Sequence, residues 1–215
     1  MSPPVQAASI ATVGVDAAPS WLSERMSAHA DARRAFDLAR ATFIAGRRID
    51  MGGLAATLGV DRTSLFRWVG NRDALLSEVL WSLAMPTLVQ AERATAELSG
   101  ALRVAELLTG FVADLNRAEY FREFLRREPA RALRLLTTTE SEIQRRYIAT
   151  ADWLVRRELG DRPLGGVIDV PSLAYLLVRV SESFTYADLI AGDEPSAARA
   201  RVAFRVLLRV DGGGA

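Results

Sequence analysis

The chain has no cysteine and only one histidine, His29, among its 215 residues. The missing cysteines exclude disulfides, thiolate metal ligands and thiol nucleophiles, and a lone histidine excludes a metal site built from several imidazoles. No nucleophile motif accompanies His29, and Gly165-Gly166 lacks the strand and helix that frame a phosphate-binding glycine loop. We therefore predict no metal, no cofactor and no enzymatic activity.

Lysine is absent as well, so all 27 basic residues are arginines, and 26 acidic residues leave a formal net charge of +1. Such a chain is not a polycation that binds nucleic acid indiscriminately. The positive charge is local, because residues 40–72 hold six arginines and two aspartates, a net charge of +4. GC-rich codon usage explains the preference for arginine, so that preference alone implies no function.

Long apolar runs are also missing, and none approaches the ~20 residues that span a bilayer. Residues 1–20 contain no basic residue, and Pro3-Pro4 and Gln6 interrupt the apolar core that a signal peptide would need. We therefore expect a cytoplasmic protein that does not associate with membranes. Its N-terminal arm, residues 1–20, is expected to be disordered, and its tail, residues 211–215, to be frayed.

The sequence does contain a succession of amphipathic helical patterns, without sustained alternation or an internal repeat. They predict an all-α fold of about ten helices. In the larger part of the chain we expect helices over residues 72–92, 101–116, 120–127, 129–136, 139–159, 171–190 and 195–210. Pro86 should kink the first of these helices, and Thr139 with Glu142 forms a capping box at the start of helix 139–159.

Residues 54–76 carry the most informative pattern. Ala55 is small enough for two helices to cross closely, and Gly59 can adopt the left-handed conformation that ends the first helix. After the second helix, Gly70 predicts another end and Asn71 a new N-cap. This pattern is typical of a helix-turn-helix, whose second helix enters the DNA major groove. An ordinary helical hairpin with a glycine in its turn is the structural alternative.

These residues together resemble the TetR family of bacterial one-component regulators. The shared features are Leu54-Ala55, Gly59-Val60, Leu65-Phe66 and Asn71-Arg72-Asp73, followed by Ala74-Leu75-Leu76. The resemblance covers residues 30–80 and implies a helix-turn-helix domain over residues 21–76. A helical ligand-binding and dimerisation domain would follow over residues 77–210. The family usually has a tyrosine at Phe66, so a phosphate contact from that hydroxyl must be absent or replaced.

Two features of the expected helix-turn-helix bear on DNA contacts. Thr63 and Arg67 lie one turn apart on helix 62–69 with Arg62 beside them, and we predict that these three residues read bases. Arginine suits that role because it can bind guanine O6 and N7 bidentately. The predicted phosphate ligands are Arg47, Arg48, Ser64 and Arg72. Gly52-Gly53 weakens the preceding helix by up to ~1 kcal/mol per glycine relative to alanine, and close approach to a phosphate is one explanation for the pair.

The last two expected helices have apolar faces broader than packing within one monomer needs. Leu176, Val180 and Phe184 belong to the first face, and Val202 and Val206 to the second. We therefore expect a four-helix interface between two copies of the chain, and a homodimer that binds an inverted-repeat operator in double-stranded DNA. The alternative is that both helices simply wrap the core of the monomer.

Aromatic and polar side chains of the larger domain are expected to line an effector pocket. Glu182 lies one turn from Arg179 and can neutralise it, which leaves no charge for an ionic ligand. We therefore expect a small, neutral, mostly apolar effector. A lactone is the first candidate, because the C-terminal half loosely resembles TetR-type regulators of lactone and quorum-signal degradation. The predicted pocket residues are Trp81, Met85, Thr109, Phe111, Asn116, Phe124, Tyr147, Trp153, Tyr175, Arg179, Ser183 and Phe184.

The resemblance thus implies a ligand-responsive transcriptional regulator, with repression as the usual mode of the family. Two alternatives remain at this point: a DNA-binding regulator without a ligand, and a helical adaptor or membrane-surface protein without specific DNA binding. Salt-dependent binding to a duplex that carries an inverted repeat separates the regulator from the adaptor.

Overall fold

The structure is a computed structural model that describes residues 20–161 and 167–210. This part of the chain forms twelve helices and no β-strand, so the predicted all-α fold is confirmed. Apart from Ser20, the predicted N-terminal arm lies outside the described residues, as do the tail and Gly165-Gly166. The count exceeds the expected ten partly because the predicted helix 171–190 is interrupted at Tyr186.

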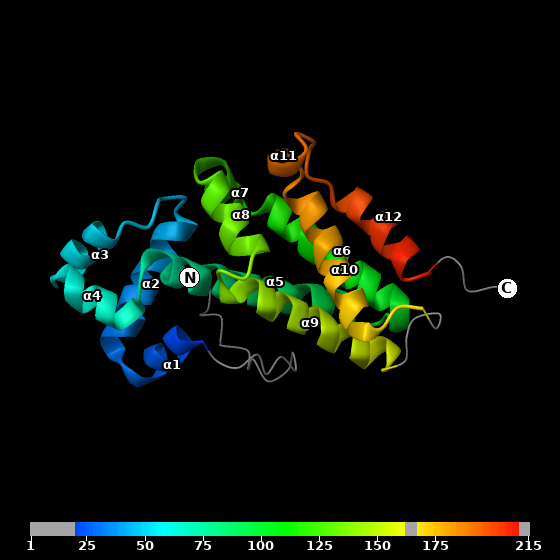
Figure 1. Ribbon diagram of the computed structural model, residues 1–215, viewed down its shortest axis with the longest axis horizontal. Coiled ribbons are helices and arrows are strands. Elements are labelled where there is room, and N and C mark those ends of the chain that lie inside the picture. The colour runs from blue at the N-terminus through cyan, green and yellow to red at the C-terminus, as the bar shows by residue number, and fades with distance from the viewer. Residues whose placement is uncertain (1–19, 162–166, 211–215) are drawn as a thin grey trace, which may run out of the picture.

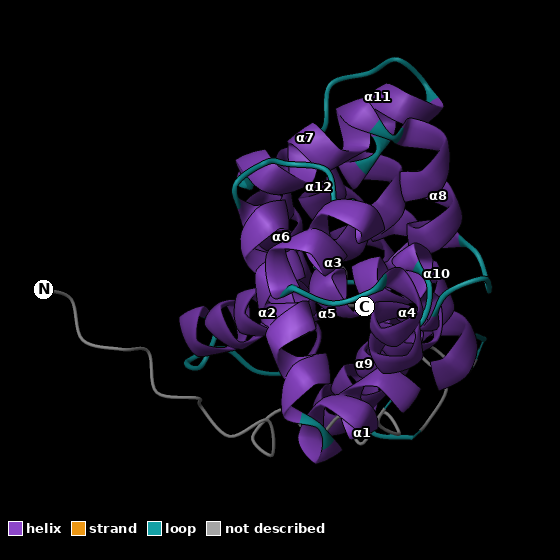
Figure 2. Ribbon diagram, turned by 90° about the vertical axis from the view of Figure 1, so that its left-hand side faces the viewer, coloured by secondary structure: helices purple, strands orange, loops and turns teal. Residues whose placement is uncertain are grey.

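The first four helices gather at one end of the elongated molecule (Figure 1). Figure 2, which looks on to this end, shows helix and connecting loop throughout the described residues. The capping residues explain where the third and fourth helices begin, since Asp50 and Asp61 each accept a hydrogen bond from the backbone N–H three residues on. These helices are α1 (Trp21–Ala28), α2 (Ala30–Ile44), α3 (Met51–Leu58) and α4 (Arg62–Val69).

The two glycines at the start of α3 have a structural explanation. A Cβ atom would lie 3.2 Å from the Asp50 carboxylate at Gly52 and 3.4 Å from it at Gly53. The Asp50 carboxylate instead lies directly over the bare backbone and accepts the Gly53 N–H at 2.6 Å. The pair therefore leaves room for the cap of α3.

Eight further helices complete the described chain, and α5 runs from the α1–α4 end along the rest of the molecule (Figure 1). Asn71 caps α5 by accepting the Ala74 N–H at 2.8 Å, as the sequence predicts. The helices are α5 (Arg72–Ala94), α6 (Gly100–Arg117), α7 (Glu119–Arg127), α8 (Pro129–Thr137), α9 (Glu142–Leu159), α10 (Val170–Thr185), α11 (Ala187–Ile190) and α12 (Ala197–Leu207).

One cap differs from its prediction. The expected Thr139 capping box is wrong, because Ser141 is the N-cap of α9 and its Oγ accepts the Ile143 N–H at 3.2 Å. The Ser141 hydroxyl in turn donates to the Leu135 carbonyl oxygen of α8, which fixes the short connection between the two helices. Glu142 is therefore the first residue of α9 and makes a local ion pair with Arg145.

Helix α5 continues without a break through Pro86. By length and composition it is apolar enough to cross a membrane, contrary to the expectation that no segment approaches this limit. Half of the most apolar 18-residue stretch of α5 is buried inside the protein, however. Its apolar side chains belong to two separate clusters, which is the arrangement of a central helix in a folded core.

The two apolar clusters divide the molecule unevenly. The first unites α1–α4 and the start of α5 with residues of α7, α8 and α9. The second unites the end of α5 with α6, α9, α10 and α12. The predicted domain boundary at residue 76 falls inside α5, and residues on both sides of that boundary contribute to the first cluster. Packing therefore connects the helix-turn-helix directly to α7 and α8.

Candidate nucleic-acid interface and ligand cavity

Helix α4 has one face in the core and one in solvent. Leu65 and Val69 are fully buried, and Trp68 packs against the same cluster. The predicted base-reading residues Arg62, Thr63 and Arg67 are all exposed on the other side. This division follows from the helical repeat, because residues three and four apart share one face. The exposed face of α4 is thus free to meet a partner.

The turn before α4 has the geometry of a helix-turn-helix. Gly59 has φ 71°, in the left-handed region that favours glycine, and ends α3. The Val60 N–H then donates to the Ala55 carbonyl at 3.0 Å, which closes the turn. Such closure at a positive-φ glycine is the standard way to satisfy the last carbonyl groups of a helix.

Ser64 has a role in the cap that the sequence analysis did not assign to it. Its hydroxyl donates to Asp61 Oδ2 and its N–H to Asp61 Oδ1, both at 2.8 Å. These bonds lower the pKa of Asp61, so its carboxylate stays charged at the N-terminus of α4. In this structure the Ser64 hydroxyl therefore serves the cap, while its predicted phosphate contact remains a prediction.

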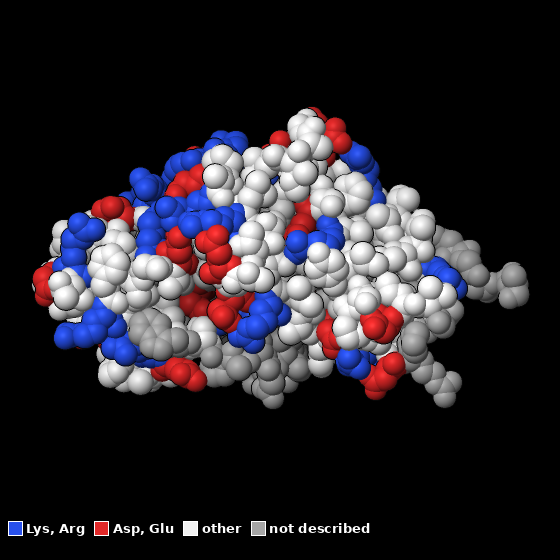
Figure 3. Space-filling model, in the orientation of Figure 1, with Lys and Arg blue, Asp and Glu red and all other residues white. Residues whose placement is uncertain are grey.

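Free arginines are concentrated on the helix-turn-helix. Most arginines of the described residues pair with a carboxylate, but Arg62 and Arg67 have no acceptor within this part of the chain, and neither does Arg47 just before α3. Arg48 is exposed and only 3.8 Å from a carboxylate oxygen of Glu128. Figure 3 shows much of the basic surface in the half of the molecule that holds α3 and α4. This surface carries cations that no internal partner neutralises.

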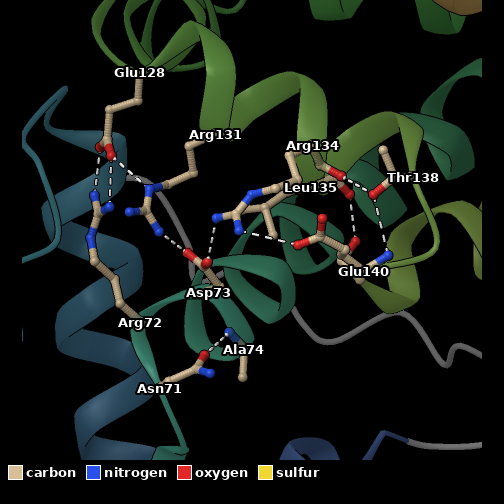
Figure 4. Close-up of polar contacts among 11 residues, drawn as sticks. Asn71, Arg72, Asp73, Ala74, Glu128, Arg131, Arg134, Leu135, Thr138 and Glu140 are labelled. Carbon is tan, nitrogen blue, oxygen red and sulfur yellow. Dashed lines mark hydrogen bonds and ion pairs between the residues drawn. The ribbon is translucent and has the colours of Figure 1, made fainter.

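Arg72 is the exception, because this predicted phosphate ligand has internal partners. Its Nε donates to the Ile49 carbonyl at 2.6 Å, and its two terminal nitrogens donate to the Glu128 carboxylate at 2.6 and 2.5 Å (Figure 4). The side chains of Arg72 and Glu128 are each only 14% exposed. Three of the five N–H donors of Arg72 are thus engaged and a carboxylate faces its charge, which disfavours a phosphate contact.

Four further ion pairs extend this contact along α8 (Figure 4). Arg131 pairs with Glu128 and with Asp73, and Arg134 pairs with Asp73 at 2.8 Å and with Glu140. We refer to Arg72, Asp73, Glu128, Arg131 and Arg134 as the α5–α8 charge network. Its cations, above all Arg72 through its hydrogen bonds, hold the pKa of Glu128 below its usual value. The network joins the first turn of α5, directly after α4, to α8.

A cavity of about 50 Å³ lies between α5, α6, α7, α8 and α9. Among the predicted pocket residues, the structure brings Trp81, Phe111 and Tyr147 together here. The sequence analysis missed two other phenols, Tyr120 and Tyr186. The lining residues are Leu80, Trp81, Leu83, Ala84, Leu88, Phe111, Leu115, Tyr120, Phe121, Leu136, Ile143, Tyr147 and Tyr186, none of them charged.

The remaining predicted aromatic pocket residues lie elsewhere. Trp153 lines a second, smaller cavity of about 20 Å³, which it shares with Tyr147. Phe124 stacks edge-on against Phe43 in the first cluster, with ring centroids 5.5 Å apart. Tyr175 is 48% exposed on α10, and Phe184 packs beside the second cluster. Phe124, Tyr175 and Phe184 therefore occupy core or surface positions outside the 50 Å³ cavity.

The predicted polar pocket residues are mostly occupied locally. Thr109 and Ser183 each donate to the carbonyl four residues earlier in their own helix, and Ser183 is exposed. Met85 packs against the second cluster and does not line the cavity. The Asn116 amide is not a lining group either, although its nitrogen and oxygen are buried without a hydrogen bond among the described residues.

The predicted pairing of Arg179 with Glu182 is present. Arg179 donates to Glu182 Oε1 at 2.9 Å, and Gln144 contacts both side chains. Burial raises the pKa of Glu182 to about 7, against the opposing effects of Arg179 and Gln144. Arg179 does not line the cavity, and its partners are Glu182 and Gln144.

Tyr147 lines the cavity, and its hydroxyl is close to Ser181 of α10. The Tyr147 hydroxyl is buried and makes no hydrogen bond of good geometry within the described residues. Burial raises the pKa of Tyr147 and that of Tyr186 well above the ordinary phenol value. Both hydroxyls therefore stay protonated.

Comparison with known proteins gives two matches. Residues 99–209 match a family described as the tetracyclin repressor-like C-terminal domain. The structure is similar to that of the R. erythropolis transcriptional repressor QsdR from the TetR family, with 26% sequence identity and a TM-score of 0.68. That similarity covers 82% of this chain and 93% of the other. No curated protein matches the sequence.

Proposed function

The chain belongs to the TetR family of transcriptional regulators, and we propose that it is a repressor that binds an inverted-repeat operator as a homodimer and is released by a small neutral effector. The observation that carries this proposal is the outer face of α4, where Arg62, Thr63 and Arg67 are exposed and the two arginines have no internal partner. Repression is further supported by the similarity to a protein described as a repressor.

DNA recognition is assigned to two groups of side chains. Arg62, Thr63 and Arg67 read base edges in the major groove, and each bidentate arginine–guanine pair contributes ~1–3 kcal/mol of discrimination. Arg47 and Arg48 flank the start of α3 and bind phosphates, which adds affinity without sequence preference. Arg72 is removed from this second group because Glu128 holds it.

A homodimer is supported by unpartnered apolar surface on α10 and α12. Val202 and Val206 of α12 are 64% and 73% exposed, and Leu176 and Tyr175 are exposed on α10, which packs against α12. Such a face is best covered by the same face of a second copy. The two α4 helices would then meet half-sites one helical turn apart, ~34–36 Å, or a multiple of that distance.

The cavity supports an effector that is apolar over most of its surface and carries one hydrogen-bond acceptor. Its walls are aliphatic and aromatic, and no charged side chain lines it. The buried Tyr147 hydroxyl makes no hydrogen bond of good geometry within the described residues, so an effector that offers it a carbonyl oxygen would gain about 1–3 kcal/mol. A lactone meets both conditions and remains our first candidate.

Effector binding is proposed to reach α4 along two connected elements. Helix α5 lines the cavity and directly follows α4, so its movement about Pro86 would displace the reading helix. Helix α8 lines the same cavity through Leu136, while Arg131 and Arg134 of α8 hold Asp73 at the start of α5. Either movement would change the spacing of the two α4 helices in a dimer, so that they no longer fit the two half-sites together.

The decisive test is a search for a protected sequence with two-fold symmetry near the start of the protein's own gene. Binding of the purified protein to that duplex should weaken steeply with salt and disappear on titration with lactones of increasing chain length. Fatty acids and charged aromatic compounds serve as comparison ligands. Salt-insensitive binding, or no preference for the symmetric duplex, would instead favour a helical adaptor or membrane-surface protein. Release by a charged compound alone would contradict the assigned cavity chemistry.

A further inference from the structure

Helix α4 exposes one large apolar side chain, Phe66, which is 40% exposed. It lies one turn after Arg62 and Thr63 and three residues before the buried Val69, at the border of the exposed face of α4. Within the described residues, this ring has no aromatic or cationic partner.

The Phe66 ring adds to the affinity for DNA only if it contacts an apolar group there. It cannot donate to a phosphate, because phenylalanine has no hydroxyl. In the major groove the base edges are mostly hydrogen-bond donors and acceptors, and the exposed apolar group is the 5-methyl of thymine. A phenylalanine beside base-reading side chains is thus matched to thymine and to no other base.

We propose that Phe66 reads a thymine through its 5-methyl group, next to the bases contacted by Arg62 and Thr63 in each half-site. This inference rests on the proposed operator binding. It adds a specificity-determining residue of apolar character to a reading face otherwise made of arginine and threonine. It also explains how the position contributes without the hydroxyl that a tyrosine would offer.

The contribution of the methyl group can be measured alone. Replacing a thymine by deoxyuridine removes the methyl and leaves the pairing edge unchanged. Loss of one buried methyl should weaken binding about fourfold, the factor that corresponds to ~0.8 kcal/mol per buried carbon. If both half-sites are replaced, the two losses should multiply to about 16-fold, because the sites are well separated.

The experiment scans the operator with single thymine-to-deoxyuridine replacements, using the full-length protein. We expect one position per half-site, related by the two-fold axis, to lose about fourfold in affinity. The variant Phe66→Ala should bind the unmodified operator more weakly and show no further loss at that position. Phe66→Leu should retain part of the sensitivity. Arg93→Ala, which removes an exposed arginine on the distant end of α5, should behave as wild type.

The possible results separate this inference from the proposed function. Equal methyl sensitivity in wild type and Phe66→Ala would assign the methyl contact to another residue and overturn the inference. Specific binding without any methyl-sensitive position would overturn it too, while the regulator proposal would stand. A protein that binds no duplex specifically would refute both. Circular dichroism checks that the Phe66 variants keep their helices.

Discussion

Glu128 offers the sharpest test of the α5–α8 charge network. Its carboxylate accepts two hydrogen bonds from Arg72, at 2.6 and 2.5 Å, and both side chains are 14% exposed. The variant Glu128→Gln keeps the shape but removes the charge. Breaking a fully buried ion pair by losing one partner costs about 3–5 kcal/mol. Arg72 keeps its bond to Ile49 and some contact with water, so we expect a loss of about 2–3 kcal/mol.

A matched control lies on the neighbouring helix. Glu123 pairs with Arg126 and Arg127, both on its own helix α7 and both more exposed than Arg72. Glu123→Gln should therefore cost less than about 1 kcal/mol. Urea unfolding followed by circular dichroism measures both variants. If Glu128→Gln cost no more than Glu123→Gln, the network would not stabilise the junction, and our account of Arg72 would be refuted.

The pH dependence of the same variant provides an independent check. The pKa of Glu128 is lowered in the folded protein from 4.5, mainly by the hydrogen bonds from Arg72. The unfolded state therefore binds the proton more readily, and the stabilisation is fully present above pH 4.5. It is lost as the pH falls through the folded pKa. Wild type and Glu128→Gln should thus converge in acid, and a difference that stayed constant would show that charge is not its cause.

Other variants test the remaining assignments. Arg67→Ala should relax base preference at one position per half-site by ~1–3 kcal/mol, measured by gel shift on operator variants, and wild-type selectivity would refute the assignment. Arg47→Ala should weaken all duplexes alike and reduce the salt slope by about one ion; an unchanged slope would remove it from the phosphate ligands. Val206→Glu should dissociate the dimer in sedimentation without loss of helix content, and an intact dimer would place the interface elsewhere. Tyr147→Phe should weaken effector release by about 1 kcal/mol while leaving operator affinity unchanged, and an unaltered release profile would show that the hydroxyl is not used.

Features encoded within a few residues were predictable from the sequence. The turn at Gly59 and the cap at Asn71 depend on contacts no more than five residues apart, and the inward face of α4 follows from its own helical repeat. The prediction failed even locally where two capping residues compete, since Ser141 and not Thr139 begins α9. Its hydroxyl also bonds to Leu135 on the preceding helix, a tertiary contact that the capping pattern does not contain.

Partners distant in sequence explain the larger misses. Arg72 stands at a helix N-terminus beside the reading helix, which favours a phosphate role, but its carboxylate partner is 56 residues away. Tyr186 was missed as a cavity residue because it lies at the break between α10 and α11. The sequence pattern predicted one continuous helix over residues 171–190. A signal was present for Arg72 only in the acidic Glu128 just before Pro129, and nothing in the sequence indicated which arginine it would meet.

The position of α8 determines how the proposed signal would travel. Leu136 faces the cavity, whereas Arg131 and Arg134, on the preceding turns of the same helix, hold Asp73. A helix this short moves as one body, so an effector that displaces Leu136 must also strain or break the ion pairs to Asp73. The reverse also holds, because coupling between two sites is reciprocal, and DNA that fixes the start of α5 must favour one shape of the cavity. A pivot at Pro86 would bend α5 itself, whereas the charge network connects the cavity wall to the first turn of α5 through α8 alone.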